Sequence, residues 1–148
     1  MRAVVQRVSE ARVRSEGRLL GSIGPGLLVL LGVTHDDSEA EAVRLAGKIS
    51  RLRIFADEAG RMNLALNAVG GELLVVSQFT LFADVRSGNR PGYSLAARPE
   101  TAIPLYERFV SELRSLGFTV ATGEFGADMQ VELVNDGPVT LIIDSTDF

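Results

Sequence analysis

Glu72-Leu73-Leu74-Val75-Val76-Ser77-Gln78-Phe79-Thr80-Leu81-Phe82 is the stretch around which the rest of the chain is organised. Its apolar run, Leu73 to Val76, follows a Gly70-Gly71 turn and is typical of a strand buried on both faces, although periodicity alone leaves a buried helical turn open. Ser77, Gln78 and Thr80 come directly after this run. A buried strand with this ending can fix hydrogen-bonding groups at the rim of a pocket. Alternatively, Ser and Thr at a strand end can simply form hydrogen bonds with the nearby backbone.

Three strands are predicted before this stretch. Residues 2–14 are rich in β-branched residues, and their alternation slips near Ser9-Glu10, as it does at a β-bulge. Glu16-Gly17 fits a hairpin turn into a second strand over residues 19–23. A Gly-Pro-Gly break then separates that strand from a buried-strand candidate, residues 27–33.

A helix is predicted to start at Ser38, because Ser38 and Glu41 have the spacing of a capping box. Apolar residues then recur on one helical face: Ala42, Leu45, Ile49 and Leu52. Arg44, Lys48 and Arg51 fall on another face. Such a basic stripe is usually a solvated face, although it would also suit a phosphate backbone.

A second helix is predicted over residues 101–116, with Gly117 as its stop and Pro104 in its first turn, where proline is tolerated. A short strand at Ile54-Phe55 is expected between the two helices. The last part of the chain predicts three more strands, with a tight Asn135-Asp136-Gly137-Pro138 turn between the final two: residues 119–122, 129–134 and 139–143. These elements indicate a single α+β domain over residues 1–148.

Composition narrows the chemistry. The chain has no cysteine, which excludes disulfides, thiolate metal sites and a cysteine nucleophile. His35 is the only histidine, so any Ser-His-Asp arrangement would have to use it, and we interpret it as a loop or capping residue. We therefore predict no metal and no cofactor. The chain has no apolar run long enough to cross a bilayer and no signal-peptide core, which predicts a cytoplasmic protein with no membrane partner.

The charge is unevenly distributed. The net charge is -4, yet all 15 Lys and Arg lie at or before Arg114, and the remaining residues carry only acids. A polar loop over residues 84–99 is longer than a connector needs, and its arginines and Tyr93 could grip a polyanion and stack on a base. A non-catalytic nucleic-acid-binding domain therefore stays open, although a high Arg content also arises from genome composition.

Two motifs, Ser77-Gln78-Phe79-Thr80-Leu81 and Asn135-Asp136-Gly137-Pro138-Val139-Thr140, together resemble the signature motifs of D-aminoacyl-tRNA deacylases. Three further segments are similar to that family, so the resemblance covers essentially the whole chain: Val4-Val5-Gln6-Arg7-Val8, Gly88-Asn89-Arg90-Pro91 and Phe125-Gly126-Ala127-Asp128-Met129. One departure is Ser87, where the family usually has a basic residue, and a tRNA phosphate contact is expected to be weaker there.

The resemblance implies a compact β-barrel-like sheet core flanked by two helices, and a homodimer with active sites at its interface. It implies hydrolysis of the ester that links a D-amino acid to the 3'-terminal adenosine of tRNA, and of glycyl-tRNA mischarged on tRNA(Ala). It also implies that Gly137-Pro138 is a cis peptide inserted into the partner's pocket, where it rejects L-aminoacyl-tRNA.

Ser77, Gln78, Phe79 and Thr80 are the candidate catalytic residues. A threonine hydroxyl is a weak nucleophile without a base, and no histidine, lysine or cysteine is near Thr80 in sequence. Our hypothesis is that the backbone amides of Phe79 and Thr80 stabilise the oxyanion while the terminal ribose 2'-hydroxyl helps to position or activate water.

Four residues are candidates for binding substrate: Gly137, Pro138, Met129 and Arg7. Main-chain carbonyls near Gly137-Pro138 would hold the substrate ammonium, Met129 would pack on the adenine, and Arg7 would brace the Gly-Pro segment. A small-molecule esterase remains a further alternative.

Overall fold

The first strand, β1 (Arg2–Ser15), organises the sheet because it pairs along both of its edges. In this computed structural model, which describes residues 1–148, one edge of β1 pairs antiparallel with β8 (Gln130–Asp144). The other edge pairs first with β3 (Gly26–Gly32) and then with β2 (Arg18–Ile23). The three predicted opening strands are confirmed, as is the bulge near Ser9-Glu10, where the β1–β8 register shifts.

The sheet closes almost into a barrel. Beyond β3 come β6 (Glu72–Ser77) and then β7 (Val120–Thr122), each parallel to the strand before it. No ladder joins β7 to β2, but the two strands approach closely at Gly21. A Cβ atom on Gly21 would lie only 2.9 Å from the carbonyl oxygen of Thr122, so this approach requires glycine.

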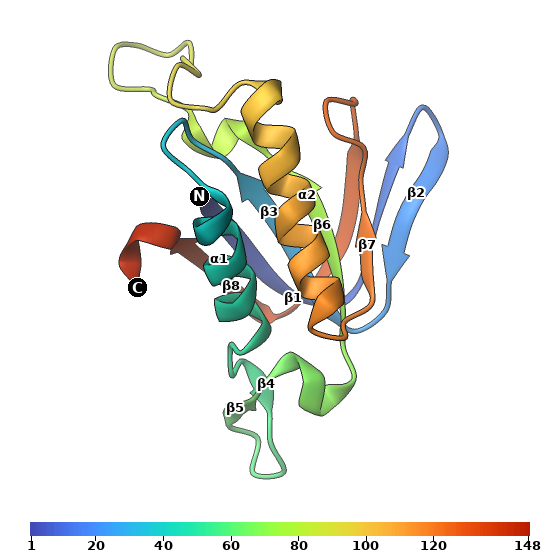
Figure 1. Cartoon of the computed structure of the whole chain (residues 1–148). Helices are drawn as coiled ribbons and strands as arrows, with labels where there is room; N and C mark the ends of the chain where they lie inside the picture. The colour runs from blue at the N-terminus through green and yellow to red at the C-terminus, as the bar shows by residue number, and fades with distance from the viewer.

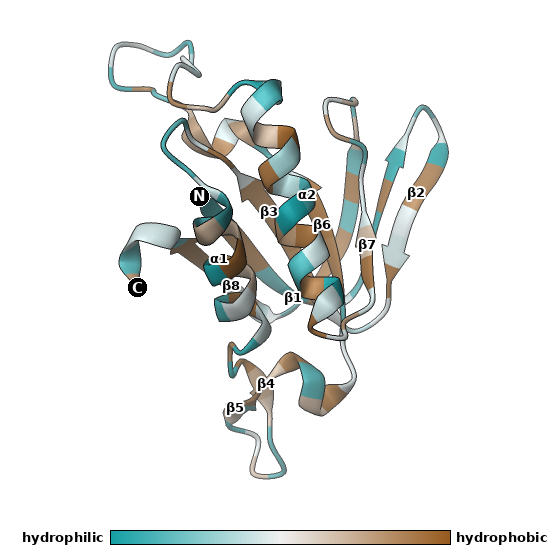
Figure 2. Cartoon of the chain, viewed as in Figure 1, coloured by the Kyte–Doolittle hydropathy of each residue, from teal (hydrophilic) through white to brown (hydrophobic).

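Two helices, α1 (Glu39–Ser50) and α2 (Pro99–Ser115), lie side by side over one face of the sheet (Figure 1). The main core, a cluster of 24 buried residues, fills the space between them and the sheet. A second cluster of seven buried residues lies inside the barrel. Figure 2 shows hydrophobic residues concentrated along β3 and β6, which explains why the apolar runs of these strands are unbroken.

The capping box at the start of α1 is confirmed, with the Ser38 amide donating to Glu41 at 2.8 Å. The short strand expected at residues 54–55 is β4 (Phe55–Ala56), which pairs with β5 (Met62–Leu64). This two-stranded arm lies at one end of the molecule, and the yellow loop before α2 lies at the other (Figure 1). Three short 3-10 helices complete the chain: η1 (Leu66–Val69), η2 (Phe79–Phe82) and η3 (Ser145–Asp147). No helix is both long and apolar enough to span a membrane.

Two predictions about elements are wrong. The segment Asn135-Asp136-Gly137-Pro138 does not turn one strand back onto another. Both flanking segments belong to β8 and pair with β1, so the extra residues form a bulge: between the pairs Val8–Asn135 and Gln6–Thr140, β1 advances by two residues and β8 by five.

The second helix begins at Pro99 rather than at residue 101, so Pro104 lies beyond the first turn. The Pro104 side chain is exposed, as is residue Glu100, whose carbonyl group a non-proline residue at 104 would bond. The helix therefore tolerates the proline at its surface.

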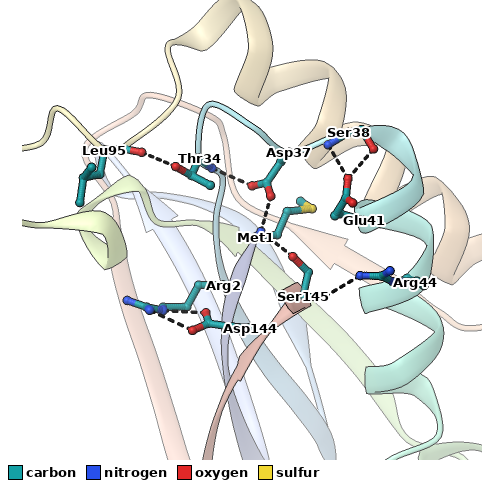
Figure 3. A network of polar contacts seen from close by, with 10 residues as sticks. All are labelled: Met1, Arg2, Thr34, Asp37, Ser38, Glu41, Arg44, Leu95, Asp144 and Ser145. Atoms are coloured by element: carbon teal, nitrogen blue, oxygen red, sulfur yellow. Dashed lines mark hydrogen bonds and ion pairs between the residues drawn. The ribbon is translucent and has the colours of Figure 1, made fainter. Parts of the chain in front are cut away.

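A partly buried polar network ties both ends of the chain to the loop after β3 (Figure 3). The Met1 ammonium lies 2.5 Å from an Asp37 carboxylate oxygen and 2.8 Å from the Ser145 hydroxyl. The other Asp37 oxygen accepts from the Thr34 amide at 2.7 Å, and the Thr34 hydroxyl donates to the Leu95 carbonyl at 2.6 Å. This network therefore connects the amino terminus to the loop that precedes α2.

Candidate active site

A cavity of about 240 Å³ opens where β6 ends, between the sheet and the first turns of α2. Ser77, Gln78 and Phe79 line one side of it, and Met129 lines another. β6 delivers the first of these residues because its apolar run ends at Ser77, where the chain turns into η2. The expectation that a buried strand delivers polar residues to a pocket rim is confirmed at this position.

Thr80 does not line the cavity but is joined to it by a hydrogen bond. The Gln78 side-chain amide donates to the Thr80 hydroxyl, and no histidine, lysine or carboxylate is hydrogen-bonded to that hydroxyl. Phe79 and Thr80 open η2, and the first N–H groups of a helix have no acceptor inside it. Main-chain donors are therefore better placed than the Thr80 hydroxyl to act on a ligand.

Aromatic residues that the sequence analysis did not select form much of the cavity wall. Tyr106 of α2 and Phe125 lie edge to face with ring centroids 6.2 Å apart. The Tyr106 hydroxyl donates to the Val75 carbonyl at 2.8 Å, and burial raises the pKa of Tyr106 to about 12. Tyr106 is therefore neutral at physiological pH and serves as a wall residue. The only sequence signal for it was its place beside Leu105 on the core face of a helix.

Phe79, which lines the cavity, also contacts the polar loop that precedes α2. Phe79 is 55% exposed and packs edge to face on Tyr93, with ring centroids 5.0 Å apart. In the same loop the Arg86 guanidinium binds Asp84 at 2.7 Å and holds the pKa of that carboxyl well below its usual range. His35 is exposed and lies 2.7 Å from the Ser94 carbonyl, so its predicted place in a loop is confirmed.

The Gly137-Pro138 segment lies elsewhere in the chain, and its peptide bond is cis. Gly137 has a φ of +134°, and a Cβ atom there would lie 2.8 Å from the Val139 nitrogen, so glycine is required. Arg7 holds this segment: its Nε donates to the Asp136 carbonyl at 3.1 Å and its Nη1 to the Ile54 carbonyl at 2.5 Å. The Arg7 side chain is only 13% exposed.

One chain does not bring the two motifs together. Gly137-Pro138 in β8 lies opposite Arg7 of β1. Arg7 pairs with Leu27 of β3, which in turn pairs with Leu73 of β6. Ser77 of β6 pairs instead with Leu31 of β3. The offset along the strands is four residues, roughly 13 Å, and three strand spacings across the sheet add roughly 14 Å. Neither Gly137, Pro138 nor Arg7 lines the cavity. The two motifs therefore lie in different places within one chain.

No group of three or more His, Asp or Glu side chains in the structure could hold a metal ion. The chemistry of the cavity is instead that of main-chain amides, hydroxyls and an amide side chain around an apolar interior. Such a site can bind a flat apolar group and polarise a carbonyl oxygen.

The family model for D-Tyr-tRNA(Tyr) deacylase matches residues 4–144. The chain belongs to this family. The D-aminoacyl-tRNA deacylase of Roseiflexus castenholzii is 62% identical to it over 148 residues, covering 100% of this chain and 94% of the relative. That of Clostridioides difficile is 58% identical over 146 residues, covering 99% of this chain and 98% of the relative. As a member of this family, the chain is a deacylase, a hydrolase of ester bonds.

Two solved structures share the fold of this deacylase. A structure described as a c-Myc DNA unwinding element binding protein superposes with a TM-score of 0.91 at 40% identity, covering 97% of this chain and 98% of that one. A probable eukaryotic D-amino acid tRNA deacylase superposes with a TM-score of 0.84 at 15% identity, covering 96% and 97% of the two chains. The predicted fold, a barrel-like sheet flanked by two helices, is confirmed.

Proposed function

We propose that this deacylase edits aminoacyl-tRNA by cleaving the ester between a D-amino acid and the 3'-terminal adenosine, and that glycyl-tRNA mischarged on tRNA(Ala) is a second substrate. The observation that carries the proposal is the cavity at the end of β6, where Ser77, Gln78, Phe79 and Met129 meet in a member of this family. We also propose that the protein works in the cytoplasm, where aminoacyl-tRNA is used.

The terminal adenosine occupies the apolar part of the cavity. Its aromatic wall offers Tyr106 and Phe125, and Met129 provides a polarizable side chain that packs on a flat base. The ester carbonyl then lies at the rim formed by Ser77, Gln78 and Phe79. This placement puts the bond to be cleaved beside the start of η2.

Cleavage proceeds by attack of water on the ester carbonyl. The amides of Phe79 and Thr80 stabilise the negative charge that develops on the carbonyl oxygen, and the ribose 2'-hydroxyl positions or activates the water. The Gln78 amide holds the Thr80 hydroxyl, which orients the first turn of η2. Because that hydroxyl has no base beside it, a covalent threonine intermediate is disfavoured.

The Gly137-Pro138 segment of a second chain completes the site. The separation of the two motifs within one chain favours a homodimer in which each cavity receives the partner's segment, with the substrate ammonium on its main-chain carbonyls. The space left admits a hydrogen atom where an L-amino acid has its side chain, so L esters are excluded and glycine is admitted. Arg7 braces the segment by binding the carbonyls of Asp136 and Ile54.

Single-turnover hydrolysis of D-Tyr-tRNA, L-Tyr-tRNA and Gly-tRNA tests the proposal, with enzyme varied from limiting to excess. Rapid cleavage of the D and glycyl esters with survival of the L ester is the expected result. Cleavage of D and L esters at equal rates would contradict exclusion at the Gly-Pro segment. Survival of all three esters would contradict the proposed activity itself.

A further inference from the structure

A second hollow of about 390 Å³ lies away from the cavity, on the outer side of α1 where the end of α2 and the last residue meet it. Three basic side chains of α1 and its C-cap line this hollow: Arg44, Lys48 and Arg51. Phe148 forms part of its wall, with the Lys48 ammonium 5.2 Å and the Arg44 guanidinium 5.5 Å from the ring centroid. We call this hollow the basic groove.

The three basic side chains of the groove form no ion pair within the chain. None of its three basic groups lies within 4.0 Å of an acidic group. The one side-chain carboxylate that lines the groove, Glu112, is held 3.0 Å from Arg108 as an ion pair one helical turn apart. In a protein with a net charge of -4, this is a local concentration of unpaired cations.

The contacts hold these cations in place before any ligand arrives. The Arg44 guanidinium donates to the Ser145 carbonyl at 2.6 Å while it faces the Phe148 ring. The Arg51 guanidinium folds back over the buried Gly47, where a Cβ atom would lie 3.1 Å from its Nη1. Groups that are already ordered lose less freedom on binding than free side chains do.

The spacing of the cations fits a nucleic-acid strand. At about 1.5 Å of rise per residue, Arg44 and Arg51 are separated by roughly 10 Å along the helix. A strand of a double helix carries one phosphate per about 3.4 Å of axis, so about three phosphates fit this length. The helix that carries these cations begins at Glu39, six residues after Val33, which lines the cavity.

We propose that the basic groove binds the phosphodiester backbone of the tRNA whose 3' end enters the cavity. This inference rests on the proposed function, because it takes tRNA as the substrate. The groove supplies affinity for the body of the tRNA and takes no part in ester cleavage. It supplies a cationic contact for a polyanionic substrate whose 3' end enters a cavity that no Lys or Arg side chain lines.

A pair of double variants tests the groove. Lys48→Gln/Arg51→Gln removes two groove charges, and Arg18→Gln/Arg61→Gln removes two exposed arginine charges that make no side-chain contact. Both variants change the net charge equally, so any general charge effect is matched. Binding of fluorescently labelled, deacylated tRNA is measured by anisotropy between about 50 and 200 mM KCl, the range over which phosphate contacts lose most affinity.

The groove variant is expected to bind tRNA roughly tenfold more weakly than wild type at low salt. Its slope of log affinity against log salt should be shallower by roughly 1.4 to 1.8, because each phosphate contact contributes about 0.7 to 0.9. The Arg18→Gln/Arg61→Gln control should retain wild-type affinity. Cleavage of a D-tyrosyl ester of adenosine, which has no phosphate backbone, should be unchanged in the groove variant.

Equal affinity of the two double variants, whether both bind like wild type or both bind weakly, would overturn the proposal. If the groove variant misfolds by circular dichroism, Lys48→Glu replaces it and should weaken tRNA binding more than Lys48→Gln does. The binding readout is independent of cleavage. A wild-type protein that shows groove-dependent binding but cleaves no D-aminoacyl ester would contradict the proposed function and leave the groove standing.

Discussion

The Thr80 hydroxyl separates two mechanisms for ester cleavage. Its hydrogen-bond donor is the Gln78 amide, and such a neutral bond is worth about 0.5 to 1.5 kcal/mol. Thr80→Ala should therefore lower kcat by about tenfold or less in single-turnover hydrolysis of D-Tyr-tRNA. Thr80→Ser, which keeps the hydroxyl, serves as the control. Loss of activity by about a million-fold, as when a covalent nucleophile is removed, would show that the hydroxyl attacks the ester.

Arg7 links the Gly-Pro segment, through the Asp136 carbonyl and carboxylate, to the Ile54 carbonyl before β4. Arg7→Gln loses both contacts, and hydrogen bonds from charged groups are worth about 1.5 to 3 kcal/mol each. We expect kcat/KM for D-Tyr-tRNA to fall roughly 10- to 100-fold and the ratio of D to L cleavage to fall with it. Arg12→Gln is the control, since it breaks only an exposed pair with Glu132. An Arg7 variant with full activity and unchanged selectivity would refute the bracing role.

At the scale of elements, the loop between β3 and α1 depends on the buried pair between the Met1 ammonium and Asp37. Asp37→Asn leaves that ammonium buried without a carboxylate, which should lower the free energy of unfolding by about 3 to 5 kcal/mol in urea titrations. Asp36→Asn, in an exposed neighbour that makes no side-chain contact, should change it by less than about 0.5 kcal/mol. Equal effects of the two substitutions would mean that the pair adds no stability.

Local patterns in the sequence predicted most helices and strands, because residues close together in the sequence determine where each of these elements forms. The capping box at Ser38 and the apolar run of β6 needed no tertiary information. Predicting the bulge in β8 did require tertiary information. A Gly-Pro pair occurs both in hairpin turns and in bulges, and only the pairing of β8 with β1 shows that this one lies in a bulge. Likewise, the resemblance placed Gly137 in the pocket of a partner chain, and only the sheet register shows that Gly137 and Ser77 lie apart within one chain.

At the scale of the whole molecule, the proposal that two chains share each site predicts complementation. Ala127→Phe fills the cavity, and Gly137→Val disrupts the Gly-Pro segment, so each variant alone should be inactive. In an equal mixture that exchanges subunits freely, half the dimers are mixed, and each of these has one intact site of two. Hydrolysis of D-Tyr-tRNA should then recover to about a quarter of the wild-type rate. A mixture that stays inactive while mixed dimers form would place both motifs in the same chain's site.

Acid should destabilise the protein through Asp144. Hydrogen bonds from Arg2 hold the pKa of this carboxyl below its ordinary value. Its contribution to stability is therefore complete above the unfolded pKa of about 3.9, and it is lost as the pH falls through the lower folded value. Urea unfolding between about pH 6 and 2 should show a smaller decline in Asp144→Asn than in wild type. Parallel declines would assign the acid sensitivity to other carboxylates.

The gap between β2 and β7 determines where the sheet opens most easily. The strands β1, β3, β6, β7 and β8 are linked by ladders of main-chain hydrogen bonds, as are β1 and β2, whereas no ladder joins β2 to β7. β2 and β7 can separate without breaking a main-chain hydrogen bond between them. The amides on their facing edges should therefore exchange with deuterium far sooner than the amides that form the ladders among β1, β3 and β6. Slow fluctuations of the molecule would then begin at this seam and leave the strand that ends at the cavity undisturbed.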